Sequence, residues 1–138
     1  MNDARDQAAV LFANEAFYRA FADRDLGAME ALWAADGPVA CIHPGWPALA
    51  SREEVLASWA RILANPDAPK VACERPRAFV LGETAFVICY EAVERTHLVA
   101  TNVFRRTADG AWKLVHHQAG PSPPPPGPRE PASRPRMN

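Results

Sequence analysis

The sequence carries almost no excess charge, because fifteen Lys and Arg residues are balanced by sixteen Asp and Glu residues. A nucleic-acid surface normally shows a basic excess, and a membrane-surface helix carries a basic face. Long apolar runs are also missing. None approaches the roughly 18 to 20 residues of a membrane span, and residues 1–6 lack the apolar run of a signal peptide. We therefore expect a cytoplasmic protein with no nucleic-acid or membrane partner.

Cysteine is scarce, and Cys41, Cys73 and Cys89 are odd in number and far apart. This pattern argues against a disulfide framework and predicts three reduced, buried thiols. A chain of 138 residues can bury enough surface to form a core without a disulfide or a metal. Cys41 and His43 share a strand face, but no short spacing of ligand residues supports a zinc site with His116. We expect neither a metal nor another cofactor.

The first half of the chain predicts three helices. Residues 3–23 repeat apolar side chains at helical spacing. Asp25 is a typical N-cap for a second, short helix that ends before Gly37. Ser51 and Glu54 form a capping box, which predicts the start of a third helix.

The second half changes to a strand pattern that is rich in β-branched and aromatic residues between turn signals. Strands are predicted over residues 39–43, 71–81, 84–94, 97–107 and 111–119. The predicted fold class is α+β, with three N-terminal helices packed on a strongly curved antiparallel sheet that forms a cone with an internal pocket. The short strand lies between helices 2 and 3, and the other four strands form a meander.

Composition divides the chain after residue 120, where a proline-rich segment begins. Residues 1–120 form the predicted domain. From Pro121 onward the chain favours polyproline II and is not expected to join a sheet. Residues 121–138 are therefore predicted to be a disordered tail. Docking to a proline-recognising partner is the alternative interpretation of this tail.

A resemblance to a known superfamily rests on four pieces of sequence. They are residues 21–26 together with 32–36, residues 41–46, residues 100–106 and residues 109–117. With the order of elements, they resemble the nuclear transport factor two-like superfamily, which has a cystatin-like cone and includes SnoaL-like domains. The resemblance covers residues 5–120. It implies a small apolar ligand inside the cone and a homodimer formed through the open face of the sheet.

The last predicted hairpin, with its Asp109-Gly110 turn, also resembles the association domain of calcium/calmodulin-dependent kinase, which is an assembly module. Ala119 stands near the place where that module has a buried arginine, so the pocket chemistry of the module is not carried over. The superfamily hosts isomerases, cyclases, dehydratases, hydrolases and binding modules. The resemblance therefore implies a fold and leaves the function open.

The ketosteroid isomerase branch of the superfamily suggests where catalysis would occur. Its catalytic aspartate precedes a proline at the place of His43, and its neutral aspartic acid matches Asn102. Histidine can abstract a proton near neutral pH, and an asparagine NH₂ can donate to an oxyanion. The tyrosine donor of that branch is missing, because Phe17 aligns with it and Tyr18 points about 100° away. Steroid isomerase activity is therefore not expected, and the alternative for His43 is a bond to a loop carbonyl.

Two adjacent histidines, His116 and His117, face opposite ways if residues 111–119 form a regular strand. The resemblance places the face of His116 and Gln118 toward the cone. We therefore predict that His116 and Gln118 are polar groups of the pocket, and that His117 is an interface or surface residue. The alternative for His116 is a satisfied core histidine.

The remaining candidates are aromatic or acidic. Trp46 stands beside His43 in a rigid Pro-Gly-Trp-Pro loop, as a wall for an apolar ligand. Glu91 is the one acid expected near the cone, unless it pairs with Thr101 across strands that face a partner subunit. The predicted catalytic residues are His43, Asn102 and His116, and the predicted ligand-binding residues are Phe17, Trp33, Trp46, Trp59, Cys89 and Gln118.

Three functions are consistent with the sequence. The first is an isomerase, cyclase or hydratase-type enzyme that acts on a small apolar ligand by histidine-assisted proton transfer. The second is a non-catalytic ligand-binding or dimerisation module, which gains support because the residues of the isomerase branch are not retained. The third is an adaptor that uses the proline-rich tail.

Overall fold

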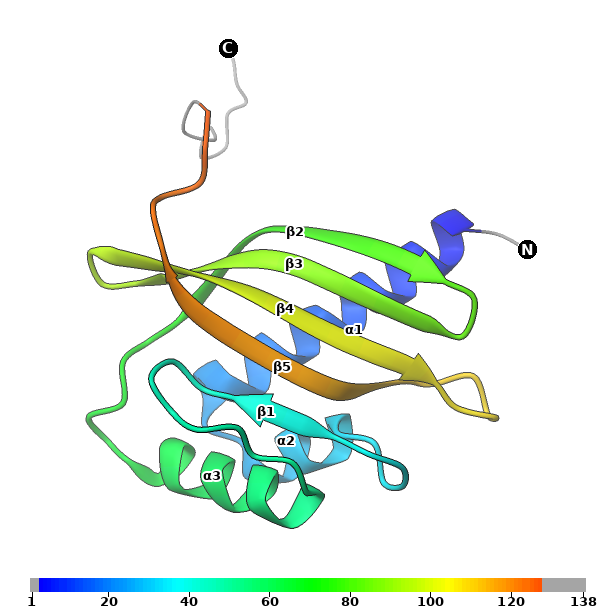
Figure 1. Ribbon diagram of the computed structural model, residues 1–138, viewed down its shortest axis with the longest axis horizontal. Coiled ribbons are helices and arrows are strands. Elements are labelled where there is room, and N and C mark those ends of the chain that lie inside the picture. The colour runs from blue at the N-terminus through cyan, green and yellow to red at the C-terminus, as the bar shows by residue number, and fades with distance from the viewer. Residues whose placement is uncertain (1–2, 128–138) are drawn as a thin grey trace.

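The computed structural model describes residues 3–127, and residues 128–138 of the predicted tail lie outside them. Its elements are α1 (Asp3–Asp23), α2 (Leu26–Leu32), β1 (Ala40–Ile42), α3 (Arg52–Ala64), β2 (Ala72–Leu81), β3 (Thr84–Val93), β4 (Thr96–Arg106) and β5 (Trp112–Ser122) (Figure 1). This order confirms the predicted α+β class and its four-stranded meander. Among the described residues, no helix is long and apolar enough to cross a membrane.

Side-chain caps explain where the two shorter helices begin. The Asp25 carboxylate accepts a backbone N–H of α2 at 3.0 Å, and the Ser51 hydroxyl accepts one of α3 at 3.1 Å. Each bond satisfies an N–H that has no partner within its helix. α2 ends at Leu32, earlier than predicted, because Trp33 has an extended backbone and pairs with Leu114 at the sheet.

The five strands form one sheet in the order β1-β5-β4-β3-β2. The meander is antiparallel as predicted, but β1 pairs with β5 in parallel, so the complete sheet is mixed. Parallel neighbours need a long connection, and α3 with the meander supplies it. α1 lies across one face of the sheet (Figure 1), α3 contacts β1, and α2 contacts both α1 and α3.

β5 continues through Pro121 and Ser122, beyond the predicted end of the sheet. Pro121 lies opposite Leu98 of β4, while the pairing with β1 on the other side stops at Gln118. β5 is therefore an edge strand at Pro121, which is the position in a sheet where proline is tolerated. The prediction that Pro121 cannot join the sheet is wrong.

α1 buries a wider arc of its surface than the apolar repeat predicts. Val10 and Phe17 are completely buried, but Asn14 and Tyr18 are also only 1% and 6% exposed. A helix that lies in the concave face of a twisted sheet contacts strands on both sides, which buries positions beyond one narrow stripe. Two polar side chains of α1 are thereby brought into the interior.

Candidate functional site

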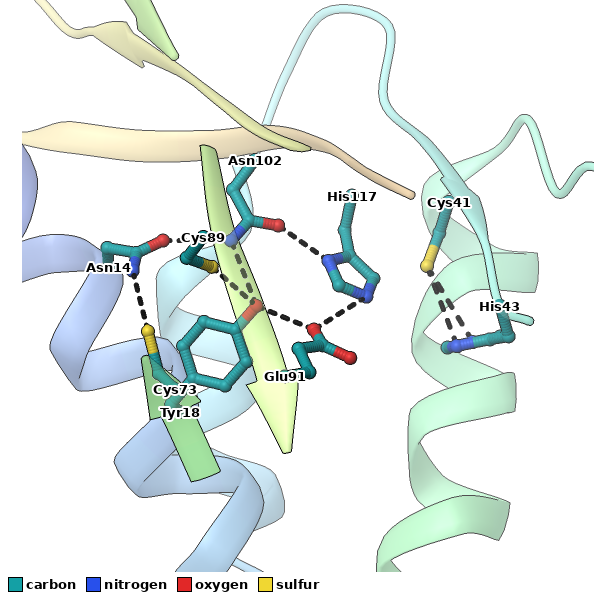
Figure 2. Close-up of polar contacts among 9 residues, drawn as sticks. All are labelled: Asn14, Tyr18, Cys41, His43, Cys73, Cys89, Glu91, Asn102 and His117. Atoms are coloured by element: carbon teal, nitrogen blue, oxygen red, sulfur yellow. Dashed lines mark hydrogen bonds and ion pairs between the residues drawn. The ribbon is translucent and has the colours of Figure 1, made fainter. Parts of the chain in front are cut away.

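Four polar side chains from four different elements meet inside the molecule (Figure 2). They are Tyr18 of α1, Glu91 of β3, Asn102 of β4 and His117 of β5, and we name them the interior cluster. None is more than 6% exposed, although three of the four are titratable. Burying such groups is costly unless they are hydrogen-bonded, so their partners decide what the cluster can do.

Hydrogen bonds and one longer polar contact connect the members of the interior cluster. The Tyr18 hydroxyl donates to Oε2 of Glu91 at 2.6 Å and accepts from Nδ2 of Asn102 at 3.3 Å. Asn102 lies directly opposite His117 on the neighbouring strand, with 2.5 Å between Oδ1 of Asn102 and Nδ1 of His117. Nε2 of His117 lies 4.0 Å from Oε2 of Glu91. The four side chains therefore form one connected polar group.

The direction of the hydrogen bonds made by the asparagine side chains fixes the tautomer of His117. Nδ2 of Asn102 donates to Oδ1 of Asn14 at 2.8 Å, and Nδ2 of Asn14 in turn donates toward Sγ of Cys73 at 3.7 Å. With its NH₂ used in this way, Asn102 presents its carbonyl oxygen to His117. His117 therefore carries its proton on Nδ1, and the lone pair of Nε2 faces Glu91.

Burial shifts the pKa of each of the three titratable members in the direction that favours its uncharged form. It raises the pKa of the Glu91 carboxyl, an effect that the bond from Tyr18 partly offsets. Burial, and then the charge of Glu91, raises the pKa of Tyr18, so the phenol remains a donor. Burial lowers the pKa of His117 to about 3, with smaller contributions from His43 and His116. At neutral pH the imidazole is uncharged, and Nε2 keeps its lone pair.

A β-bulge at Val115 reverses the predicted orientation of the end of β5. Phe104 of β4 pairs with Leu114, whereas the preceding Val103 pairs with His116, so Val115 has no opposite residue. One extra residue in a strand shifts every following side chain to the other face.

The two histidines after the bulge exchange the roles predicted for them. His117 is 2% exposed and points into the interior, whereas His116 is half-buried, with Nδ1 placed 3.1 Å from the carbonyl oxygen of Ala40 in β1. Gln118 is exposed. The predicted placement of His116 and Gln118 in the pocket is therefore wrong, and the residue that belongs to the interior is His117.

His43 is held by a serine of α3 rather than by a loop carbonyl. Its Nε2 lies 2.9 Å from the hydroxyl of Ser58, and that hydroxyl donates to the carbonyl oxygen of Val55 at 2.7 Å. The proton shared by His43 and Ser58 must therefore come from the imidazole. Burial lowers the pKa of His43 to about 4, which keeps the ring neutral. Nδ1 then keeps its lone pair and lies 3.9 Å from Sγ of Cys41.

His43 also packs among aromatic rings and beside a thiol. Its ring centroid lies 4.8 Å from Trp46, 4.9 Å from Trp59 and 6.4 Å from His117. Nε2 lies 3.6 Å from Sγ of Cys41. Burial raises the pKa of that thiol to about 12, so Cys41 is not a thiolate nucleophile. Of the predicted catalytic residues, only Asn102 is a member of the interior cluster, with His43 nearby and His116 outside.

The predicted ligand-binding residues separate into two groups. Phe17 packs against His117 and Trp59 at centroid distances of 5.0 and 5.4 Å, and Sγ of Cys89 lies 3.3 Å from the Tyr18 hydroxyl. These residues enclose the interior cluster. Trp33 instead lies beside Leu114, Trp46 covers His43, and Gln118 is on the outer surface.

An open groove between α1 and β2 reaches one member of the interior cluster, Tyr18. Its volume is about 550 Å³ and its lining includes Asn14, Tyr18 and Cys73 together with Leu11 and Pro76. This volume is within the range of sites that bind small molecules. This groove approaches the cluster at Tyr18, on the side of α1 and β2, whereas the sequence predicted a ligand beside His43 and Trp46.

The family model of the SnoaL-like domain matches residues 10–124. The chain belongs to this family. A solved structure described as a proposed dehydratase of the NTF2-like family from Streptomyces avermitilis is 39% identical to it. That structure covers 88% of this chain, this chain covers 99% of that one, and the TM-score is 0.79. The SnoaL-like assignment confirms the superfamily that the sequence indicated.

Two further structures show the range of functions attached to this fold. A proposed calcium/calmodulin-dependent protein kinase type II association domain from Thiobacillus denitrificans is 33% identical, with coverage of 80% and 93% and a TM-score of 0.72. A ketosteroid isomerase-like protein from Erwinia carotovora atroseptica is 18% identical, with coverage of 86% and 98% and a TM-score of 0.69, and supports the fold alone. A comparison with curated proteins gives no match.

Proposed function

We propose that this SnoaL-like domain is an enzyme that binds a small, largely apolar molecule and eliminates water from it by proton transfer. The observation that carries the proposal is the buried Glu91 carboxyl, which accepts from Tyr18 and faces the lone pair of His117. A carboxyl whose pKa is raised by burial is a suitable general base near neutral pH, and perturbed groups of this kind cluster at functional sites.

In the proposed elimination of water, the Glu91 carboxyl acts first as a base and then as an acid. The Glu91 carboxylate removes a proton from the carbon next to a carbonyl group of the substrate. The carbon–oxygen bond to a hydroxyl group on the next carbon breaks, a carbon–carbon double bond forms, and Glu91 returns the proton to the departing oxygen. The products are water and an α,β-unsaturated carbonyl compound, and the enzyme regains its starting state.

Tyr18 and His117 have positioning and stabilising roles in this scheme. The Tyr18 phenol keeps its proton because its pKa is raised, so it can donate to the carboxylate or to a carbonyl oxygen that gains negative charge. Nε2 of His117 carries a lone pair toward Glu91 and accepts a hydrogen bond from the substrate hydroxyl. The groove lined by Tyr18 admits a molecule of suitable size, and the 39% identical relative is described as a proposed dehydratase.

The test uses β-hydroxy ketones and β-hydroxy thioesters together with their unsaturated products. A thermal-shift screen identifies the compounds that bind, since a ligand at a hundred times its Kd adds about 2.7 kcal/mol of stability. Absorbance of the conjugated product then measures turnover. We expect Glu91→Gln to abolish turnover but retain binding, and the exposed Glu94→Gln to change neither. Full activity of Glu91→Gln would exclude the scheme.

A second candidate function is assembly without catalysis. The outer face of the sheet carries Ile88 and Val99, which are each 36% exposed, and the stacked rings of Phe79 and Phe86. Apolar side chains on a solvent-facing sheet are typical of an interface, and the 33% identical relative is described as a proposed association domain. On this basis we also propose a homodimer through the sheet. Light scattering should give a dimer for the wild type and a monomer for Ile88→Lys.

A further inference from the structure

Two of the three cysteines are neighbours on adjacent strands of the sheet. Cys73 on β2 lies directly opposite Glu91 of β3, and Cys89 lies two residues before Glu91 on the same inward face. A β-bulge between Glu74 and Arg77 interrupts the pairing of β2 beside Cys89. The two thiols therefore face each other diagonally across the least regular part of this strand pair.

The two thiols affect each other and have different surroundings. The interaction with the neighbouring thiol is the largest cause that lowers the pKa of Cys89 and raises the pKa of Cys73. The Tyr18 hydroxyl lies 3.3 Å from Sγ of Cys89, and Nδ2 of Asn14 lies 3.7 Å from Sγ of Cys73 (Figure 2). The opposite directions of the two pKa shifts make Cys89 the more readily deprotonated thiol of the pair.

Access to solvent also distinguishes the three thiols. Cys73 is half-buried and lines the groove between α1 and β2, so a small oxidant reaches it directly. Cys89 is 0% exposed and lies diagonally across the strand pair from Cys73. Cys41 is also 0% exposed, and it lies beside His43 with a strongly raised pKa. It therefore serves as an internal control.

We propose that Cys73 and Cys89 form a peroxide-sensitive thiol pair that closes to an intramolecular disulfide at the base of the groove. One thiolate sulfur attacks an oxygen of the peroxide, the oxygen–oxygen bond breaks, and water leaves as the sulfur becomes a sulfenic acid. The second thiol displaces hydroxide from that sulfur and releases a second water as the S–S bond forms. The two thiols supply two electrons, and hydrogen peroxide accepts them.

Closing the bond requires a small movement of β2. Diagonal neighbours on one face of a sheet have Cα atoms about 7 to 8 Å apart, whereas a disulfide needs roughly 4.4 to 6.8 Å. The bulge after Cys73 interrupts the hydrogen bonding between β2 and β3 at the place where these two strands must move closer together. Forming the disulfide would change the contacts that Tyr18 makes with Cys89 and Asn14 makes with Cys73, at the wall of the groove. This effect does not depend on whether the domain is an enzyme.

The experiment treats the full chain with a small excess of hydrogen peroxide, removes the oxidant, denatures the protein and counts its thiols. The wild type should fall from three free thiols to one, lose two hydrogens in mass, and yield a Cys73–Cys89 peptide pair that dithiothreitol cleaves. Cys41→Ser should form the same pair and retain no free thiol. In Cys73→Ser and Cys89→Ala no intramolecular disulfide should form.

Several results would overturn the proposal. They are three free thiols remaining in the oxidised wild type, a peptide pair that includes Cys41, a disulfide between two chains, or over-oxidation of Cys73 with Cys89 still free. Because the readout is the thiol count and the peptide mass, it does not depend on turnover. A catalytically inactive domain with a reversible Cys73–Cys89 bond would reject the proposed dehydration and retain this inference.

Discussion

Nδ1 of His117 lies 2.5 Å from Oδ1 of Asn102, although an unbroken strand would direct His117 away from the interior. The β-bulge at Val115 makes this contact possible, because it shifts the end of β5 by one residue. His117 is thereby placed 4.0 Å from Glu91, which itself is bonded to Tyr18. The proposed chemistry depends on this arrangement.

The protein is predicted to lose stability in acid because two of its histidines are buried in the neutral form. The pKa of His117 is about 3 and that of His43 about 4 in the fold, both below the value near 6.5 expected for an unfolded chain. The unfolded state therefore binds more protons below pH 6.5, and stability is lost as the pH falls from there toward 4. We expect a loss of up to about 1.4 kcal/mol per pH unit for each histidine. Urea denaturation at pH 7, 6 and 5 measures it, and His117→Phe should flatten the curve.

Glu91 is predicted to have the opposite effect on stability. Its folded pKa is raised, so its contribution is complete below the unfolded pKa and is lost as the pH rises through the folded pKa. Glu91→Gln keeps an acceptor for Tyr18 without the buried charge. We expect this variant to be more stable than the wild type at pH 8 by on the order of 1 kcal/mol, and the gain to shrink at pH 5. An equal effect at both pH values would contradict the assignment.

Much of the fold was predictable from the sequence because its signals are local. The caps at Asp25 and Ser51 and the change of periodicity after residue 70 indicate the helices and strands directly. The parallel pairing of β1 and the entry of Pro121 into the sheet were not predictable from local signals, because both depend on which strands lie side by side.

The site was less predictable for two physical reasons. Nothing in the residues around Val115 indicates a bulge, so regular alternation gave the wrong histidine. Tyr18 was set aside because it lies one position from Phe17, yet α1 is buried over an arc wide enough for both. A signal was present: Asn14 and Tyr18 are four residues apart, and polar residues repeated at that spacing beside an apolar stripe indicate a shared interior partner.

The Tyr18 hydroxyl is predicted to matter for stability. Tyr18→Phe removes the donor to Glu91 and leaves a buried carboxylate without this bond. Leaving a buried acceptor unsatisfied typically costs 1 to 3 kcal/mol, so we expect a loss of about 2 kcal/mol at pH 7 in urea denaturation. The control is Tyr90→Phe on the half-buried outer face, which should cost well under half as much. Equal losses would indicate that the Tyr18–Glu91 bond is unimportant.

His43 is predicted to be a structural partner of Ser58. Ser58→Ala and His43→Ala should each destabilise the fold by about 1 to 3 kcal/mol, since each leaves a buried polar group without its partner. In the double variant the losses should be clearly less than additive, as expected for groups in contact. Additive losses would show that the two side chains act separately. Once a substrate is identified, Ser58→Ala should retain turnover.

The protonation state of His117 tests the interior cluster most sharply, and nuclear magnetic resonance of the ¹⁵N-labelled histidine rings measures it between pH 8 and pH 5. His117→Asn and His116→Asn serve to assign the two signals. We expect His117 to stay neutral at pH 5, with its proton on Nδ1 and an unprotonated Nε2. A His117 ring that titrates near pH 6.5, or that carries its proton on Nε2, would contradict the interior cluster and the chemistry proposed for it.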